Sequence, residues 1–267
     1  MTVFFYELKM LRKSIVTWIL ATATFLVLYN SFYPSFGKDA AFMEKILANY
    51  PEAMLKALGM NTGLSLSSVL GYFAFTFVFV QVLLAIQASN YGFSILSIEE
   101  RELTADFLMT KPISRRNIIV SKFLAVLTAL IITDIGTSVF AFISIEMFKD
   151  GNDYDVSYVV ILLASTIVFQ LFYVAVGMLI SVTTKKIRSV LSYSMALAFG
   201  TYMINAVRGI LDSDLLGIIT PFYHFDPNYI LGHGHWNYGA ASISIIVTVI
   251  SLIASYVLYS RRNIHSL

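Results

Sequence analysis

The stretch VLGYFAFTFVFVQVLLAIQASNYGFSILS, residues 69–97, contains no Asp, Glu, Lys or Arg. A helix of roughly 20 mostly apolar residues crosses the ~30 Å hydrocarbon core of a bilayer. Backbone polar groups in that core must be paired within the protein, and a helix pairs them inside one segment. This stretch therefore predicts a transmembrane helix.

Five other apolar runs of similar length occur along the 267-residue chain. A closed β-barrel would instead show segments of about 10 residues with alternating apolar and polar side chains. The runs are continuous, so we predict an all-α polytopic membrane protein that forms one transmembrane domain over residues 1–267. The six predicted spans are about 15–33, 69–97, 119–147, 157–183, 189–210 and 239–259.

Composition indicates the same class of protein. The chain is 58% hydrophobic and 13% charged, with a mean hydropathy of +0.76. A soluble domain carries about 25% charged residues, so this chain lacks the charge to cover a surface exposed to water. The absence of cysteine excludes disulfides, thiolate catalysis and cysteine-ligated metals.

A cleaved signal peptide is the alternative interpretation of the N-terminus, because Lys9, Arg12 and Lys13 precede the first apolar run. That run ends in LYNSFYPSF, which offers no small-residue cleavage site. We therefore expect the run to be retained as the first span.

Lysine and arginine are divided unevenly between the predicted loops. Six spans with both termini cytoplasmic put 13 of the 18 basic residues on the cytoplasmic side, as the positive-inside rule requires. The net charge of +2 thus reflects topology rather than a nucleic-acid partner. The five on the other side are Lys38, Lys45, Lys56, Lys149 and Arg208.

The densest block of mixed charge is SIEERELTADFLMTKPISRRNIIVSK, residues 97–122. Residues 97–110 place apolar side chains near one face, which predicts a short amphipathic helix. Pro112 disfavours helix at the residue before it, and Ser114 is a typical N-cap for the next helix. One interpretation is a helix in the membrane interface whose basic side chains reach the headgroups.

The same block resembles the cytoplasmic loop of type-2 ABC exporter permeases. That loop typically has an acidic start, Gly-Thr, two or three apolar residues, Pro, an apolar residue, Ser-Arg and a later Lys. The usual glycine is Leu103 here, so we expect the helix to continue without a hinge. The resemblance extends to the six-span layout and to YPEAMLKALG (50–59) in the first outer loop. The matching residues are Glu100, Glu102, Thr104, Phe107, Leu108, Pro112, Ile113, Ser114, Arg115 and Lys122.

The resemblance implies that the loop is a coupling helix, which docks in a groove of a separate ATP-binding subunit. Phe107, Leu108 and Met109 would be its apolar anchors, and the surrounding charges would set orientation and partner choice. Arg115 and Arg116 could instead contact lipid phosphates. The implied coupling residues are Glu100, Glu102, Thr104, Phe107, Leu108, Met109, Pro112, Ser114 and Arg115.

No Walker A pattern, G-x-x-x-x-G-K-[ST], occurs in the chain. The chain is therefore not expected to be an enzyme or to hold a cofactor, and ATP and Mg²⁺ would be bound by two partner ATPase subunits. Six spans make half a transporter, so a second copy or a related permease would complete it. The implied setting is a bacterial cell membrane.

Few charges and many aromatics in the spans favour an apolar or amphipathic cargo, such as an antimicrobial peptide, a peptide toxin or a drug. An ion-coupled secondary transporter or a membrane scaffold is the alternative. An intramembrane protease is another: Glu99-Glu100 begins the E-E-x-x-x-R motif of prenyl-protein proteases. However, Thr104 stands at the arginine position, no histidine lies inside a span, and G-x-S-x-G is absent.

Three segments outside the spans are also apolar enough to touch the membrane. FFYELKMLRKS (4–14) predicts an amphipathic helix along the inner leaflet before the first span. The first outer loop, 34–68, predicts two short amphipathic helices on either side of Pro51. The last outer loop, 211–238, predicts a re-entrant hairpin before the sixth span.

Asp134 is the conspicuous polar residue inside a span, because a carboxylate in hydrocarbon is costly and is a functional candidate by default. The alternative is a structural carboxyl, hydrogen-bonded to Thr133, Thr137, Ser138 or a neighbouring helix. Four amides in the spans are expected to link helices; they are Gln81, Gln87, Gln170 and Asn205.

Near the outer end of the fifth span, Arg208 is expected to extend towards Asp212 or Asp214. The histidines of the last outer loop match no strong zinc-site spacing, so we predict no metal site there. The residues considered for it are His224, His233, His235 and Asp226.

Overall fold

The structure is a computed structural model that describes residues 2–38, 45, 49–51, 54–55, 64–101, 114–184 and 187–261. All regular secondary structure in this part of the chain is helical. Six helices are long and apolar enough to cross a membrane, as predicted. They are α1 (Thr2–Asn30), α5 (Val69–Arg101), α7 (Arg115–Phe148), α8 (Val156–Thr183), α9 (Val190–Leu211) and α13 (Tyr238–Arg261).

Some helices extend beyond the predicted spans. The amphipathic segment 4–14 is helical but continuous with the first span, and the second span runs unbroken to Arg101. Residues 102–113, which include most of the predicted coupling helix, lie outside the described residues. In the first outer loop the structure describes α2 (Tyr33–Lys38), whereas most of the predicted helix pair around Pro51 lies outside the described residues.

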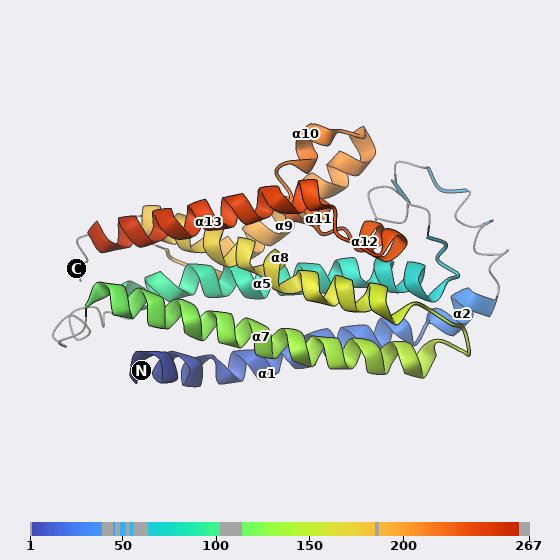
Figure 1. Cartoon of the computed structure of the whole chain (residues 1–267), viewed down its shortest axis with the longest axis horizontal. Coiled ribbons are helices and arrows are strands. Elements are labelled where there is room, and N and C mark those ends of the chain that lie inside the picture. The colour runs from blue at the N-terminus through green and yellow to red at the C-terminus, as the bar shows by residue number, and fades with distance from the viewer. Residues whose placement is uncertain are drawn as a thin grey trace.

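The long helices form three layers, which Figure 1 shows from the side. α5 and α8 pack closely together in the middle, α1 and α7 form a second close pair, and α9 and α13 cover the opposite side. α7 contacts α5 and α8 much less than it contacts α1. Both termini lie at one end of the bundle, and α2 lies at the other.

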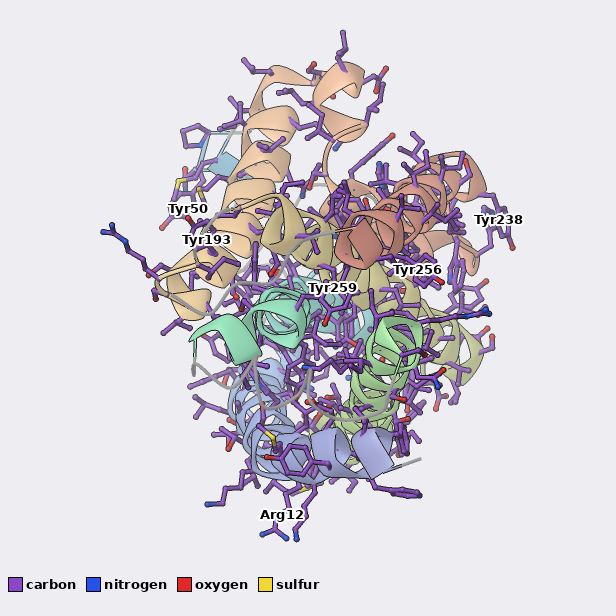
Figure 2. All side chains as sticks on the ribbon, turned by 90° about the vertical axis from the view of Figure 1, so that its left-hand side faces the viewer. Arg12, Tyr50, Tyr193, Tyr238, Tyr256 and Tyr259 are labelled. Atoms are coloured by element: carbon purple, nitrogen blue, oxygen red, sulfur yellow. The ribbon has the colours of Figure 1, made fainter. Side chains whose placement is uncertain are left out.

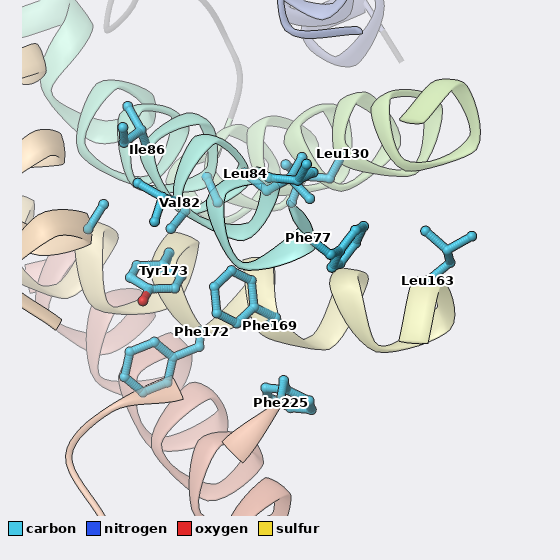
Figure 3. Close-up of a cluster of buried hydrophobic side chains, with 14 of the residues drawn as sticks. Phe77, Val82, Leu84, Ile86, Leu130, Leu163, Phe169, Phe172, Tyr173 and Phe225 are labelled. Carbon is cyan, nitrogen blue, oxygen red and sulfur yellow. The ribbon is translucent and has the colours of Figure 1, made fainter. Parts of the chain in front are cut away.

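Glycines allow the central pair to approach closely. A Cβ atom at Gly92 of α5 would lie 2.5 Å from the Val174 carbonyl oxygen of α8. A Cβ atom at Gly177 would lie 3.2 Å from the Phe93 backbone nitrogen. Helices in membranes meet at small residues because packing, not water exclusion, holds them together. Buried aromatic side chains also fill the bundle (Figure 3): Phe77, Phe169, Phe172, Tyr173 and Phe225.

Buried polar side chains connect helices within and between layers. Hydrogen bonds of this kind satisfy groups that would otherwise be unpaired in hydrocarbon. Three of the four amides predicted to link helices take part, because Gln170 of α8 bonds to Asp134 of α7 in addition to the bonds of Gln81 and Gln87. The bonds are Thr22–Thr137 (3.0 Å), Asn30–Ser144 (2.8 Å), Gln87–Thr133 (2.9 Å) and Gln81 to the Phe225 carbonyl oxygen (2.8 Å).

Helix starts follow capping chemistry. Ser114, Asp155 and Ser189 precede α7, α8 and α9, and the side chain of each accepts a hydrogen bond from a backbone N–H in the first turn. In the turn between α7 and α8, Asp150 and Gly151 take positive φ angles of 51° and 78°. Glycine adopts this conformation at no steric cost.

The segment before α13 folds as three short helices. They are α10 (Asp214–Gly217), α11 (Pro221–His224) and α12 (Pro227–His233). Proline is the first residue of both α11 and α12, where its missing N–H would be unpaired in any case. α12 packs against α5 and α8, at the end of the bundle away from the termini (Figure 1). Re-entry of the loop 211–238 into the membrane stays a prediction.

Candidate functional site

The structure describes both ends of the predicted coupling loop. Glu100 lies in the last turn of α5, and Arg115 is the first residue of α7. Ser114 caps α7, because its Oγ accepts a hydrogen bond from the Asn117 backbone N–H at 3.3 Å. The coupling role of these residues stays a prediction. Six of the predicted coupling residues lie outside the described residues: Glu102, Thr104, Phe107, Leu108, Met109 and Pro112.

Lys122, two turns into α7, is buried with 1% of its surface exposed. Its Nζ donates to the Ile95 carbonyl oxygen of α5 at 2.9 Å. The same Nζ lies 3.2 Å from Glu7 Oε1 of α1. One ammonium group therefore joins the three helices that meet beneath the loop. We call this arrangement of Lys122, Glu7 and Ile95 the lysine junction.

Burial of a charge requires pairing, since an uncompensated charge in a protein interior costs several kcal/mol. In the sequence Lys122 is a cytoplasmic basic residue and a match to the loop pattern, and neither feature predicts its burial. Glu7, set between apolar residues of the segment 4–14, was the available signal. Arg12 on the same helix is exposed, and Figure 2 shows it projecting away from the bundle.

A second polar connection joins the same three helices deeper in the bundle. The Gln87 amide nitrogen on α5 donates to Thr133 Oγ1 of α7 at 2.9 Å and lies 3.2 Å from the Tyr91 hydroxyl. The Tyr91 hydroxyl donates to Ser14 Oγ of α1 at 3.1 Å. α1, α5 and α7 are thus connected at two levels, one near the end of the bundle that carries the loop and one about halfway along α7.

Asp134, midway along α7, bonds to the neighbouring helix α8. With its side-chain nitrogen facing the carboxyl, Gln170 donates to the two Asp134 oxygens at 3.3 and 3.2 Å. The Thr166 hydroxyl lies beside the same group. Thr133 and Thr137, two of the proposed partners on α7 itself, bond to other helices instead. The hydrogen-bonding role of Asp134 is therefore between helices, and any further function stays a prediction.

Asp134 also lines a lateral groove of about 650 Å³ between α7 and α8. This groove follows a helix pair with few mutual contacts. The other lining residues are apolar except for one hydroxyl: Ile131, Ile135, Ser138, Val139, Phe142, Val160, Leu163, Ala164 and Ile167. A single carboxyl group in an apolar groove is suited to an amphipathic molecule with a hydrogen-bond donor or a cation.

Arg208 differs from its expected arrangement. It forms no ion pair with Asp212 or Asp214, both of which the structure describes. Its guanidinium carbon instead lies 3.6 Å from the centroid of the Tyr223 ring. Arginine favours such flat stacking because the ring face is electron-rich.

Two of the histidines of the last outer loop, His233 and His235, lie together, with their ring centroids 5.9 Å apart. His224 is buried, and its Nδ1 lies 2.6 Å from Ser244 Oγ. Burial lowers the pKa of His224 to about 4. His233 and His235 are exposed. Within the described ranges, no group of three His, Cys, Asp or Glu side chains is placed to hold a metal ion.

Six long apolar helices with polar links between them indicate a multi-pass membrane protein. A family model described as ABC-2 family transporter protein matches residues 1–264. The chain therefore belongs to the ABC-2 transporter family, as the charged loop indicated. It is a membrane permease, and the ATPase of such a transporter is a separate protein. No curated protein matches the chain significantly.

Proposed function

We propose that the chain is the permease subunit of an ATP-driven exporter of an apolar or amphipathic molecule, such as an antimicrobial peptide, a peptide toxin or a drug. Two copies, or this chain and a related permease, would pair with two ATPase subunits that bind ATP and Mg²⁺. The observation that carries the proposal is the lysine junction, because it connects the helices beneath the loop into one unit.

A force applied to residues 102–113 acts on two helices at once, since α5 ends at Arg101 and α7 begins at Arg115. Through Lys122 the same displacement reaches α1. α1 and α7 pack closely and would move as one body, whereas the contact of α7 with α8 is sparse. Movement driven by ATP would therefore change the width of the lateral groove.

The groove supports the proposed class of cargo. Its wall is apolar apart from Asp134 and Ser138, so it can hold hydrocarbon or aromatic groups without leaving polar groups unpaired. Asp134 offers one place for a positive or hydrogen-bonding group. Export from the cytoplasmic side, in a bacterial cell membrane, completes the proposal.

The test is association with the ATPase. Phe107→Glu combined with Leu108→Glu should abolish co-purification of the ATPase and leave membrane insertion unchanged. Tyr238→Glu is the matched control, because Tyr238 is 70% exposed and lies at the end of the bundle away from the termini. Undiminished co-purification with the double variant would contradict the coupling role.

An ion-coupled secondary transporter is the alternative, and the half-buried carboxyl of Asp134 inside a span is the observation that favours it. Proteoliposomes that contain only this chain distinguish a secondary transporter from an ATP-driven exporter. Cargo movement driven by a proton gradient, without the ATPase and without ATP, would support the alternative. Movement that requires both the ATPase and ATP would support the exporter.

A further inference from the structure

A second cavity, separate from the lateral groove, lies at the end of the bundle away from the termini. Its volume is about 530 Å³, and it is enclosed by the end of α9, by α12 and by residues next to them. The polar lining differs from the apolar wall of the lateral groove. The charged and aromatic residues that line it are Arg208, Asp212, Tyr223, Asp226, Tyr229 and His233.

Arg208 lies over the Tyr223 ring in surroundings that leave room for it. A Cβ atom at Gly217 would lie 2.8 Å from the Tyr223 ring and 3.1 Å from Arg208 Nε, so the absence of a side chain there makes room for the stack. The Nε atom is buried and has no hydrogen-bond partner among the described residues. The face of the guanidinium group lies against the ring, so the ring uses none of its N–H donors, and the Asp226 carboxyl interacts with the same group electrostatically.

The two acidic residues of the cavity have different roles. Asp226 is engaged in the fold, because its Oδ1 accepts a hydrogen bond from the Asn228 N–H at 2.9 Å and caps α12. Asp212 is exposed and ends α9 with a positive φ of 50°. In the described part of the chain its carboxylate forms no ion pair with Arg208, although its backbone N–H bonds to the Arg208 carbonyl oxygen. Asp226 is the carboxyl of this cavity that interacts electrostatically with Arg208, and Asp212 is a second, exposed carboxylate that is not paired with it.

Apolar side chains follow and precede Asp212, which lines this cavity, along the chain. Those around α10 are exposed: Leu211 at 64%, Leu215 at 75%, Ile218 at 53% and Ile219 at 53%. α10 packs against α9 and α11, which carry Arg208 and Tyr223. A ligand whose charged head occupies the cavity can thus lay an apolar chain along α10.

We propose that this cavity binds the headgroup of a zwitterionic amphiphile. Its phosphate or carboxylate lies against Arg208, its ammonium group lies near Asp212, and the rings of Tyr223 and Tyr229 flank the head. Separate opposite charges on the protein match separate opposite charges on the ligand, whereas a purely anionic head would meet the Asp212 carboxylate. The site is independent of the coupling loop and of ATP.

Binding to the purified full chain in maltoside micelles tests this site, measured by isothermal titration calorimetry. Dihexanoyl-phosphatidylethanolamine is the zwitterionic probe, and dihexanoyl-phosphatidylglycerol is the anionic one with the same tails. Glycerophosphoethanolamine supplies the zwitterionic head without tails. We expect the ethanolamine lipid to bind at least 10-fold more tightly than either of the other two.

Variants of Arg208 and Asp212 test which charge of the ligand each residue binds. Arg208→Gln should weaken binding of the ethanolamine lipid at least 10-fold. Asp212→Asn should weaken it several-fold while binding of the glycerol lipid stays equal or improves. Asp214→Asn is the control, because Asp214 is an exposed acidic residue of the same segment that does not line the cavity.

Equal binding of the ethanolamine and glycerol lipids to the unmodified chain would overturn the proposal, as would tight binding of the tail-free head. Should Arg208→Gln fail to fold, as judged by size-exclusion chromatography, Asp212→Asn decides the matter, because Asp212 is exposed. Unchanged affinity of that variant for the ethanolamine lipid would overturn the proposal. No ATPase is present in this experiment, so its failure would leave the exporter proposal intact.

Discussion

Lys122 Nζ on α7 lies 3.2 Å from Glu7 Oε1 on α1, in a place where the lysine is almost completely buried. A buried pair of this kind contributes little net stability when intact, but breaking it by removing one partner costs about 3–5 kcal/mol. The pair could stabilise the fold, or it could carry movement of the loop to α1. A double-mutant cycle combined with an activity measurement separates these two roles.

Lys122→Met and Glu7→Gln should each lower the free energy of unfolding. The double variant should lose less than the sum, with a coupling energy of roughly 1–3 kcal/mol. Thermal unfolding in detergent measures these values. We also expect transport by the reconstituted complex to fall more than ATP hydrolysis, because α1 is uncoupled from the loop. Lys149→Met breaks the surface pair with Glu146, which is 2.8 Å long. It should change neither the free energy of unfolding nor transport. Equal losses for both lysines would contradict the junction.

Gly92→Ala should destabilise the central pair of helices. The added Cβ would lie 2.5 Å from a backbone oxygen of α8, and backbone cannot move aside like the end of a side chain. Overpacking of this kind costs about 1–3 kcal/mol, which thermal unfolding detects. Gly200→Ala is the matched control on α9, because nothing lies within 4 Å of its added Cβ. It should be neutral or stabilising, since alanine is favoured in helices by about 1 kcal/mol.

Asp134→Asn should keep the fold, since an asparagine can still bond to Gln170. We expect it to slow transport of cationic amphiphiles and to leave transport of neutral ones unchanged, because only a cationic group can form an ion pair with the carboxyl. Asp134→Leu should in addition lower the free energy of unfolding by about 1–3 kcal/mol, because the buried Gln170 amide loses its partner. Equal transport of both cargo types by Asp134→Asn would make the carboxyl purely structural.

Stability should fall as the pH decreases from 6.5 towards 4. His224 titrates near its usual pKa of 6.5 when the chain is unfolded, and burial lowers that pKa to about 4 in the folded protein. The unfolded chain therefore binds the extra proton in this window, while above pH 6.5 the contribution of His224 is fully present. The expected loss is roughly 1–3 kcal/mol. Unfolding midpoints measured across this range should be flatter for His224→Gln, whereas His233→Gln, at an exposed position, should follow the unmodified chain.

The six spans could be predicted from the sequence because hydrocarbon imposes a length and a composition on each of them. The N-cap at Ser114 could also be predicted, since capping depends on residues within one turn. The partners of Asp134 could not, because they depend on which faces of α7 and α8 meet. The burial of Lys122 was missed for a related reason: a lysine near a helix end satisfies the positive-inside rule whether or not it is exposed.

The contact made by Arg208 at the end of α9 could not be predicted from the sequence either. Arg208 was expected to reach an acidic residue four or six positions along the chain, which is the arrangement that local spacing favours. The fold brings Tyr223 within reach instead, because Gly217 leaves room for the stack. The contact of Arg208 with Tyr223 depends on the absence of a side chain at Gly217. The spacing of charged residues in the sequence does not reveal such a contact.

The pairing of the first long helix with the third has a consequence for biosynthesis. Thr22 and its partner Thr137 are 115 positions apart, so at 5–20 residues per second the ribosome needs roughly 6–23 seconds to synthesise the partner after Thr22 has been made. During that interval α1 is in the bilayer without its neighbour. Thr22 Oγ1 lies within 3.1 Å of the Trp18 and Ile19 carbonyl oxygens of its own helix, and its hydroxyl can therefore stay satisfied until α7 is inserted.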